Sequence, residues 1–367
     1  MNTPKPYSPF TPFVAIAMIA CMLAVACSKD VQPIDTAAKR QADSADSAKI
    51  FFQRHVDSVI NRFSPIGFTK TVVKDAKALT ELRRTYAKTD STWAAYRALT
   101  LANRKDINYY RVGDTVMMPD TIVEDLRAYS IFPQWYPEAI DIPRLVLISN
   151  KWQCYGCYSN GELVRFAAVN SGEEHKPTFP GRYAVNWKQR LRHSSLDSTW
   201  ILPFTVNFHQ FAGSAMHQFD MPGRPVSHSC VRQFLSDAEW MFKFVRTKKV
   251  DSNRRSIPFS GTPVIILDVF DFSRRKGGPW RDITSTKDVV IALPKMPLEV
   301  EEALIPISQI PKDVRGGLPN RKRYMEADSI LRERGVIRPK ANLRESINYN
   351  KLRRDKKRLR SAAHKKK

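Results

Sequence analysis

The sequence predicts a mainly β domain, preceded by a helical region and followed by a basic extension. Three observations predict this order. Stretches before residue 104 carry apolar side chains at helical spacing. From residue 144 the hydrophobic period changes to two, and turn residues separate short apolar runs. Beyond residue 271, proline and basic residues dominate.

The first 27 residues indicate export. Residues 13–26, FVAIAMIACMLAVA, form an apolar run that is short for a membrane span and closes on small residues, as a secretory signal does. Cys27 follows directly, which resembles the bacterial lipoprotein signal, where this cysteine is lipidated. We expect residues 1–27 to be such a signal, with lipidation at Cys27, on a protein exported to the periplasm. An ordinary cleaved signal or an N-terminal anchor stays open, and either one also implies export.

The positive charge is concentrated in the tail. The chain of 367 residues has a formal charge of +24, and 20 Lys+Arg against 6 Asp+Glu between Lys312 and Lys367 account for +14 of it. A basic tail is typical of a solvated segment or of one that binds anionic polymers. Because we expect export, nucleic acid is excluded as a partner, and polymers of the cell envelope replace it.

We interpret residues 28–130 as a tether followed by a mainly helical region. Residues 31–62 begin as a polar tether and become an amphipathic helix. Its apolar positions are Ile50, Phe51, Val56, Val59 and Ile60. Residues 70–103 also have a helical composition. Residues 101–120 resemble the end of a LysM peptidoglycan-binding repeat through Gly113-Asp114 and Pro119, although a plain turn before a strand explains the same residues.

Residues 143–270 are predicted to form the β domain. Strands are expected within residues 144–173, 176–190 and 199–219, and a last buried strand within 261–270. One helix, residues 237–248, is expected to open on a capping box formed by Ser236 and Glu239. Residues 271–367 should form a loosely packed, proline-containing basic extension with one helix at residues 325–336.

Two cysteines of the β domain form a C-x-x-C motif. Cys154 and Cys157 lie in a strand pattern, where residues i and i+3 point to opposite faces, so a bond between them is disfavoured. Structural thiols, a disulfide and a redox pair all stay open. We expect no metal, because the chain lacks a second C-x-x-C or an H-x-H pair.

The candidate site lies in residues 216–234, MHQFDMPGRPVSHSCVRQF. A thiol beside an imidazole or a helix N-terminus gains thiolate character and becomes a nucleophile. His228 lies two residues before Cys230, on the same side of an extended segment. His217 precedes the DMPGRP turn, so it can face the sulfur across the loop as a base. Arg232 can hold a carboxylate or a neighbouring carbonyl.

These residues resemble the signature of the bacterial L,D-transpeptidase catalytic domain. HQFDMPGRPVSHSCVR is similar to its upstream His, Pro-Gly loop and Ser-His-Gly-Cys-Val/Ile-Arg motif. HKPTFPGRYAV, NGELVRFAAVNSGE and GTPVIIL are similar to its turn, early hairpin and last strand. The resemblance implies an L,D-transpeptidase-like β-sandwich with one helix after the catalytic loop, and a cysteine acyltransferase that acts on peptidoglycan stem peptides.

The resemblance also implies a role for each site residue. Cys230 would be the nucleophile, and His217 the general base and acid. His228 would flank the sulfur. The backbone N–H groups of Ser229 and Cys230 would form the oxyanion site. Arg232 would position the donor or the loop, and Ser227 would serve the oxyanion or the substrate. Ser229 replaces the usual glycine, and a positive φ there would cost about 1–2 kcal/mol. We expect the loop to hold residue 229 at a negative φ.

The sequence therefore predicts a membrane-anchored L,D-transpeptidase of the cell envelope, with a role in cell wall organisation and cell shape. Its donor and acceptor would be stem peptides, and carbapenems would be inhibitors. No cofactor is expected. Two alternatives stay open: an L,D-carboxypeptidase that hydrolyses the acyl-enzyme, and a catalytically silent peptidoglycan-binding lipoprotein.

Overall fold

The computed structural model describes residues 36–274 and 277–364. The chain separates into two units, residues 1–53 and residues 54–367. The predicted signal, with Cys27, lies outside the described residues. None of the described helices combines the length and the apolarity needed to cross a membrane. Helix α1 (Thr36–Ile60) confirms the predicted helix, and Val56 and Val59 near its end are buried.

A small β-α-α-β unit precedes the main sheets. It consists of β1 (Phe68–Val72), α2 (Ala76–Thr85), α3 (Trp93–Asn103) and β2 (Thr115–Pro119). β1 and β2 pair antiparallel. The unit has an apolar cluster of its own, which includes Leu99 and Tyr110. The sequence predicts a helical region at residues 70–103, so strand β1, which takes up the first three of these residues, is a correction. The LysM resemblance stays a prediction.

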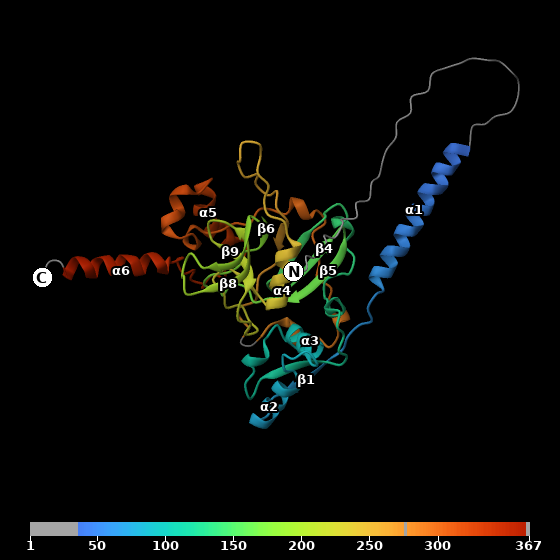
Figure 1. The fold of residues 1–367 in the computed structure, drawn as a ribbon, viewed down its shortest axis with the longest axis horizontal. Helices are drawn as coiled ribbons and strands as arrows, with labels where there is room; N and C mark the ends of the chain where they lie inside the picture. The colour runs from blue at the N-terminus through green and yellow to red at the C-terminus, as the bar shows by residue number, and fades with distance from the viewer. Residues whose placement is uncertain (1–35, 275–276, 365–367) are drawn as a thin grey trace, which may run out of the picture. The chain divides into compact units, whose positions relative to one another are not determined.

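Two sheets form the predicted mainly β domain (Figure 1). The first has the order β5-β4-β3-β11-β6, and the second has the order β10-β9-β8-β7. The strands of the first sheet are β3 (Leu145–Ser149), β4 (Cys154–Ser159), β5 (Glu162–Ala168), β6 (Gly181–Ala184) and β11 (Pro263–Ile266). Those of the second are β7 (Trp187–His193), β8 (Ile201–His209), β9 (Ser214–Gln218) and β10 (Val231–Gln233). Two pairs are parallel, β3 with β11 and β9 with β10.

Strand β3 is buried on both faces. Val146 and Ile148 join one apolar cluster with Val206 of β8 and Met216 of β9, so the two sheets share this core. Leu147 and its neighbours on the other face join a second cluster, to which Ala98 and Leu101 of α3 contribute. Because each face of β3 contacts a different layer, its residues are apolar without alternation.

The C-x-x-C cysteines point to opposite faces of β4, as the strand pattern predicts. Cys157 belongs to the core between the sheets, and Cys154 belongs to the cluster on the α3 side. Both are buried free thiols. Burial raises the pKa of Cys154 to about 12 and raises that of Cys157 well above its usual value. Of the three alternatives, the structure contains structural thiols.

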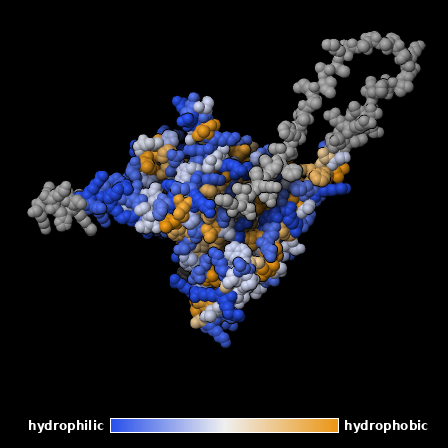
Figure 2. Space-filling view, viewed as in Figure 1, coloured by the Kyte–Doolittle hydropathy of each residue, from blue (hydrophilic) through white to orange (hydrophobic). Residues whose placement is uncertain are grey.

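The C-terminal extension is packed into the domain, which corrects the expected loose packing. The predicted helix is α5 (Arg321–Glu333), whose Ala327 and Leu331 are buried in the core that the two sheets share. Helix α6 (Tyr349–His364) follows, and the surface of its residues 349–358 is mostly hydrophilic (Figure 2). Helix α5 thus buries a narrow apolar face, although many of its residues are basic.

Helix α4 (Leu235–Phe244) begins two residues earlier than a capping box at Ser236 would place it. Its N-cap is Phe234, and the hydroxyl of Ser236 instead accepts a hydrogen bond from Arg97 of α3 at 2.6 Å. The predicted capping box is therefore wrong. Asp237 is buried and pairs with Arg97 at 2.9 Å and with Arg165 of β5 at 2.5 Å. These ion pairs join α4 to α3 and β5.

We predict that Asp237→Ala lowers the free energy of unfolding by about 3–5 kcal/mol, because it leaves two partly buried guanidinium groups without a counter-charge. Glu239→Ala is the control, since Glu239 pairs with Lys243 at the surface of the same helix, and it should leave the free energy of unfolding nearly unchanged. Urea unfolding measures both. Equal losses in the two variants would contradict the proposed role of the buried ion pairs.

Candidate active site

The parallel pairing of β9 with β10 brings the candidate residues to one face. Met216 is opposite Val231, and both point into the core between the sheets. Because strand residues alternate, His217 of β9 and Cys230, which directly precedes β10, face the other side of this pair, whose strands lie about 4.8 Å apart. A cavity of about 700 Å³ opens on that side. Five of the six predicted residues line it: His217, Ser227, His228, Cys230 and Arg232.

His217 is a buried, neutral imidazole. Its Nδ1 lies 2.9 Å from the Gln218 carbonyl oxygen, so Nδ1 donates the hydrogen bond and Nε2 keeps its lone pair. Burial lowers the pKa of His217 to about 4, although the bond to Gln218 opposes this shift. At neutral pH the ring can therefore accept a proton through Nε2.

Cys230 is held as a thiol. Its Sγ lies 3.8 Å from the Gly213 carbonyl oxygen. Burial raises the pKa of Cys230. Two smaller effects lower this pKa, a backbone hydrogen bond from Ala215 and the charge of Arg232. We expected a neighbouring imidazole and the helix N-terminus to favour the thiolate. The structure corrects this expectation, because His217 is itself neutral and supplies no positive charge.

His228 lies at the cavity between aromatic and charged neighbours. Its ring centroid is 5.3 Å from that of Trp200, and its Nε2 is 3.9 Å from the Glu173 carboxylate. Burial lowers the pKa of His228, and the charge of Lys176 adds to this while Glu173 opposes it. The role of His228 in flanking the sulfur stays a prediction.

Arg232 and Ser227 hold the loop that carries the site. Arg232 donates to the carbonyl oxygens of Asp220 at 3.2 Å and Val226 at 3.4 Å, and its guanidinium covers the Phe219 ring at 4.6 Å. The Ser227 hydroxyl donates to the Cys230 carbonyl. Of the two roles considered for Arg232, its contacts are those of loop positioning.

Ser229 adopts a left-handed backbone, with φ +72°. The expected negative φ is therefore wrong. The Ser229 N–H donates to the Lys176 carbonyl at 2.9 Å, so it is engaged there rather than at an oxyanion position. Thr178 donates to the Ser229 carbonyl at 3.1 Å, and the hydroxyl groups of Ser229 and Ser214 are 2.8 Å apart. These contacts hold the residue in a conformation that costs a serine about 1–2 kcal/mol.

The cavity also has walls that sequence reasoning missed. The loop from β7 to β8 contributes Leu196 and Trp200, and the C-terminal extension contributes Val314 and Asn348. No local pattern marks these residues, because tertiary packing alone brings them to the site. The carbonyl of Gln218, which orients His217, is a backbone group and carries no sequence signal.

Residues 143–266 match the family model of the L,D-transpeptidase catalytic domain, which confirms the family resemblance for this segment. No curated protein matches the chain. An L,D-transpeptidase from Stackebrandtia nassauensis is 19% identical, with 35% of this chain and 57% of that one covered and a TM-score of 0.29. An LD transpeptidase in complex with imipenem is 17% identical, with 34% and 59% covered and a TM-score of 0.27. An L,D-transpeptidase from Xylanimonas cellulosilytica is 20% identical, with 55% and 97% covered and a TM-score of 0.33.

The match to the first two of these structures spans less than two thirds of their length, at 57% and 59%. The chain outside residues 143–266, including the helical region and the C-terminal extension, has no counterpart in the matching family model.

We predict that Ser229→Ala destabilises the protein more than Ser229→Gly does. Alanine keeps the strained φ and loses the hydrogen bond to Ser214, which costs about 1 kcal/mol. Glycine loses the same bond but relieves about 1–2 kcal/mol of strain, so its net effect should be small. Urea unfolding measures the two variants. Equal stability would show that residue 229 is not strained.

We predict that the alkylation of Cys230 by iodoacetamide keeps accelerating up to pH 9, because the reagent requires the thiolate and the raised pKa keeps the sulfur protonated. Mass spectrometry of peptides follows the rate, and the buried Cys154 and Cys157 serve as internal controls that should stay unlabelled. A plateau that begins below pH 8 would indicate a thiolate paired with His217 and would contradict this protonation state.

Proposed function

We propose that this protein is an L,D-transpeptidase of the cell envelope that forms an acyl-enzyme at Cys230 with peptidoglycan stem peptides. One observation supports this most directly: His217 of β9 and Cys230, directly before β10, line the same cavity within the segment that matches the L,D-transpeptidase catalytic domain. We take the two sheets around their common core as the β-sandwich of this family.

The first half-reaction would begin from a neutral pair. The thiol proton passes to His217 Nε2 as Sγ attacks the carbonyl carbon that precedes the terminal D-residue. The C–N bond then breaks, and the departing amine takes the proton from the imidazolium. A neutral thiol and a neutral imidazole suit this sequence, because charge develops only as the sulfur attacks and Gln218 then stabilises the protonated ring.

The second half-reaction regenerates the Cys230 thiol. The nitrogen of an acceptor amine attacks the thioester carbonyl and gives its proton to His217. The C–S bond then breaks, and the sulfur takes the proton back from His217. The developing oxyanion would be stabilised by the Cys230 N–H, since the Ser229 N–H donates to Lys176. Ser227 and Arg232 act by holding the loop, and His228 flanks the cavity entrance beside Trp200.

Water could replace the amine, and the product would then be that of an L,D-carboxypeptidase. A silent peptidoglycan-binding lipoprotein is the alternative from another class. It would require neither the oriented imidazole of His217 nor an accessible thiol in the same cavity, so the arrangement of these two residues favours an enzyme.

We also propose that the protein is exported to the periplasm and anchored there by lipid at Cys27. The apolar run at residues 13–26 and the cysteine directly after it support this proposal. Stem peptides are then the available substrates, and nucleic acid is not a partner. The basic residues of the C-terminal segment would face anionic polymers of the envelope.

We predict that Cys230→Ala abolishes turnover of a tetrapeptide muropeptide monomer by the purified full-length protein. Chromatography of the products separates three outcomes for the wild type: a cross-linked dimer indicates a transpeptidase, a tripeptide indicates a carboxypeptidase, and no change indicates a binding protein. Imipenem should add its mass to the peptide that contains Cys230, and the variant should not react.

Cys230→Ser is the matched control, because it keeps the shape of the side chain and replaces only the nucleophile. It should retain the wild-type unfolding transition and lose the acylation. Turnover by Cys230→Ala at the wild-type rate would exclude the proposed mechanism.

A further inference from the structure

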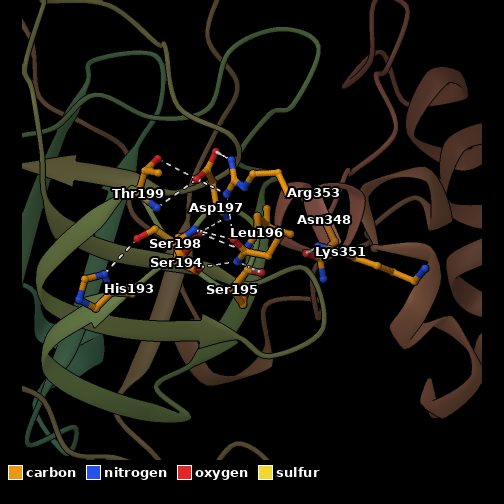
Figure 3. A network of polar contacts seen from close by, with 11 residues as sticks. His193, Ser194, Ser195, Leu196, Asp197, Ser198, Thr199, Asn348, Lys351 and Arg353 are labelled. Atoms are coloured by element: carbon orange, nitrogen blue, oxygen red, sulfur yellow. Dashed lines mark hydrogen bonds and ion pairs between the residues drawn. The ribbon is translucent and has the colours of Figure 1, made fainter. Parts of the chain in front are cut away.

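The loop between β7 and β8 forms one wall of the catalytic cavity. Ser194, Ser195, Leu196 and Trp200 of this loop line the cavity together with Cys230. The beginning of α6, more than 150 residues further along the chain, lies against this loop (Figure 3). Its contacts concentrate on two residues, Asn350 and Arg353.

Asn350 binds the loop through both its backbone and its side chain. Its backbone N–H donates to the Leu196 carbonyl at 2.9 Å. Its side-chain N–H₂ donates to the carbonyl oxygens of Ser194 at 3.2 Å and Ser195 at 2.9 Å. Its side-chain oxygen accepts from the Ser198 N–H at 2.9 Å. The side-chain amide of Asn350 therefore supplies hydrogen-bond partners for backbone groups of the loop that are not paired in the sheet.

Arg353 adds a charged contact to the same loop. It donates to the two carboxylate oxygens of Asp197 at 2.7 and 3.2 Å and to the Asn350 side-chain oxygen at 2.9 Å. Asp197 also accepts from the N–H and hydroxyl of Thr199. The guanidinium lowers the pKa of Asp197, so the carboxylate is charged at neutral pH.

The loop ends at the catalytic side of the cavity. The Trp200 ring centroid lies 5.3 Å from that of His228 and 6.3 Å from that of Tyr349 of α6. Asn348, which lines the cavity, donates to Asp313 at 3.0 Å. The C-terminal extension thus contacts both the loop and the aromatic wall beside His228.

We propose that Asn350 and Arg353 are positioning residues for the donor peptide. They hold the loop of residues 194–200, which includes Trp200, in the position that sets the width of the cavity. The C-terminal extension is then a part of the active site. This inference rests on the proposed function. Without the side chain of Asn350 the loop samples wider positions, and the donor must order it on binding, so donor affinity falls while the chemistry at Cys230 is unchanged.

The test compares Asn350→Ala, Asn350→Asp and Lys351→Ala in the full-length protein with a tetrapeptide monomer as donor. We expect Asn350→Ala to raise KM about tenfold with little change in kcat, since the three side-chain hydrogen bonds to the loop and the one from Arg353 are lost. Asn350→Asp keeps the acceptor for Ser198 and Arg353 but sets a carboxylate oxygen against the Ser194 and Ser195 carbonyls, so it should not restore KM. Lys351 pairs with Asp355 on the same helix, and its alanine variant should behave as wild type.

Hydrogen exchange of the peptide that covers residues 194–200 provides a readout that does not depend on activity. Asn350→Ala should accelerate exchange at Ser198, while the global unfolding transition stays the same. An active wild type with equal KM in all variants would overturn this inference alone, as would unchanged exchange at Ser198. An inactive wild type would overturn the proposed function and this inference with it.

Discussion

The parallel pairing of β9 with β10 is the constraint on which the candidate site depends. Met216 and Val231 occupy the core between the sheets, and this burial sets the register of the two short strands. A shift by one residue would place His217 in the core and Met216 at the cavity, because strand side chains alternate. The apolar contacts of two residues with no chemical role therefore decide where a thiol and an imidazole lie.

The sequence predicts the parts of this arrangement that local patterns encode. The period-two runs from residue 144 predict the sheets, and the spacing of His217, His228 and Cys230 around a Pro-Gly loop predicts the site. Strand β1 was missed because its partner β2 follows only after two helices. The start of α4 was misplaced because Arg97, from another element, binds the Ser236 hydroxyl that a capping box would use. The walls of the cavity from the C-terminal extension follow from packing between distant segments, which no local pattern records.

The backbone of Ser229 illustrates how a strained residue is maintained. Lys176 and Thr178 bind its N–H and carbonyl, and Ser214 binds its hydroxyl. Unfavourable backbone conformations persist where the surroundings specify them through several contacts at once. The segment around residues 176–178 is consequently part of the scaffold of the thiol, although it contributes no reactive group.

The raised pKa of the Cys230 thiol also bears on its sensitivity to oxidation. Peroxides and disulfides react with thiolates far faster than with thiols, so a sulfur that remains protonated is oxidised slowly. The two other described cysteines, Cys154 and Cys157, are enclosed on either side of β4 and cannot approach Cys230 as resolving partners. Under the proposed function, a sulfur that is protonated at rest would be oxidised slowly even though no resolving thiol lies beside it among the described residues.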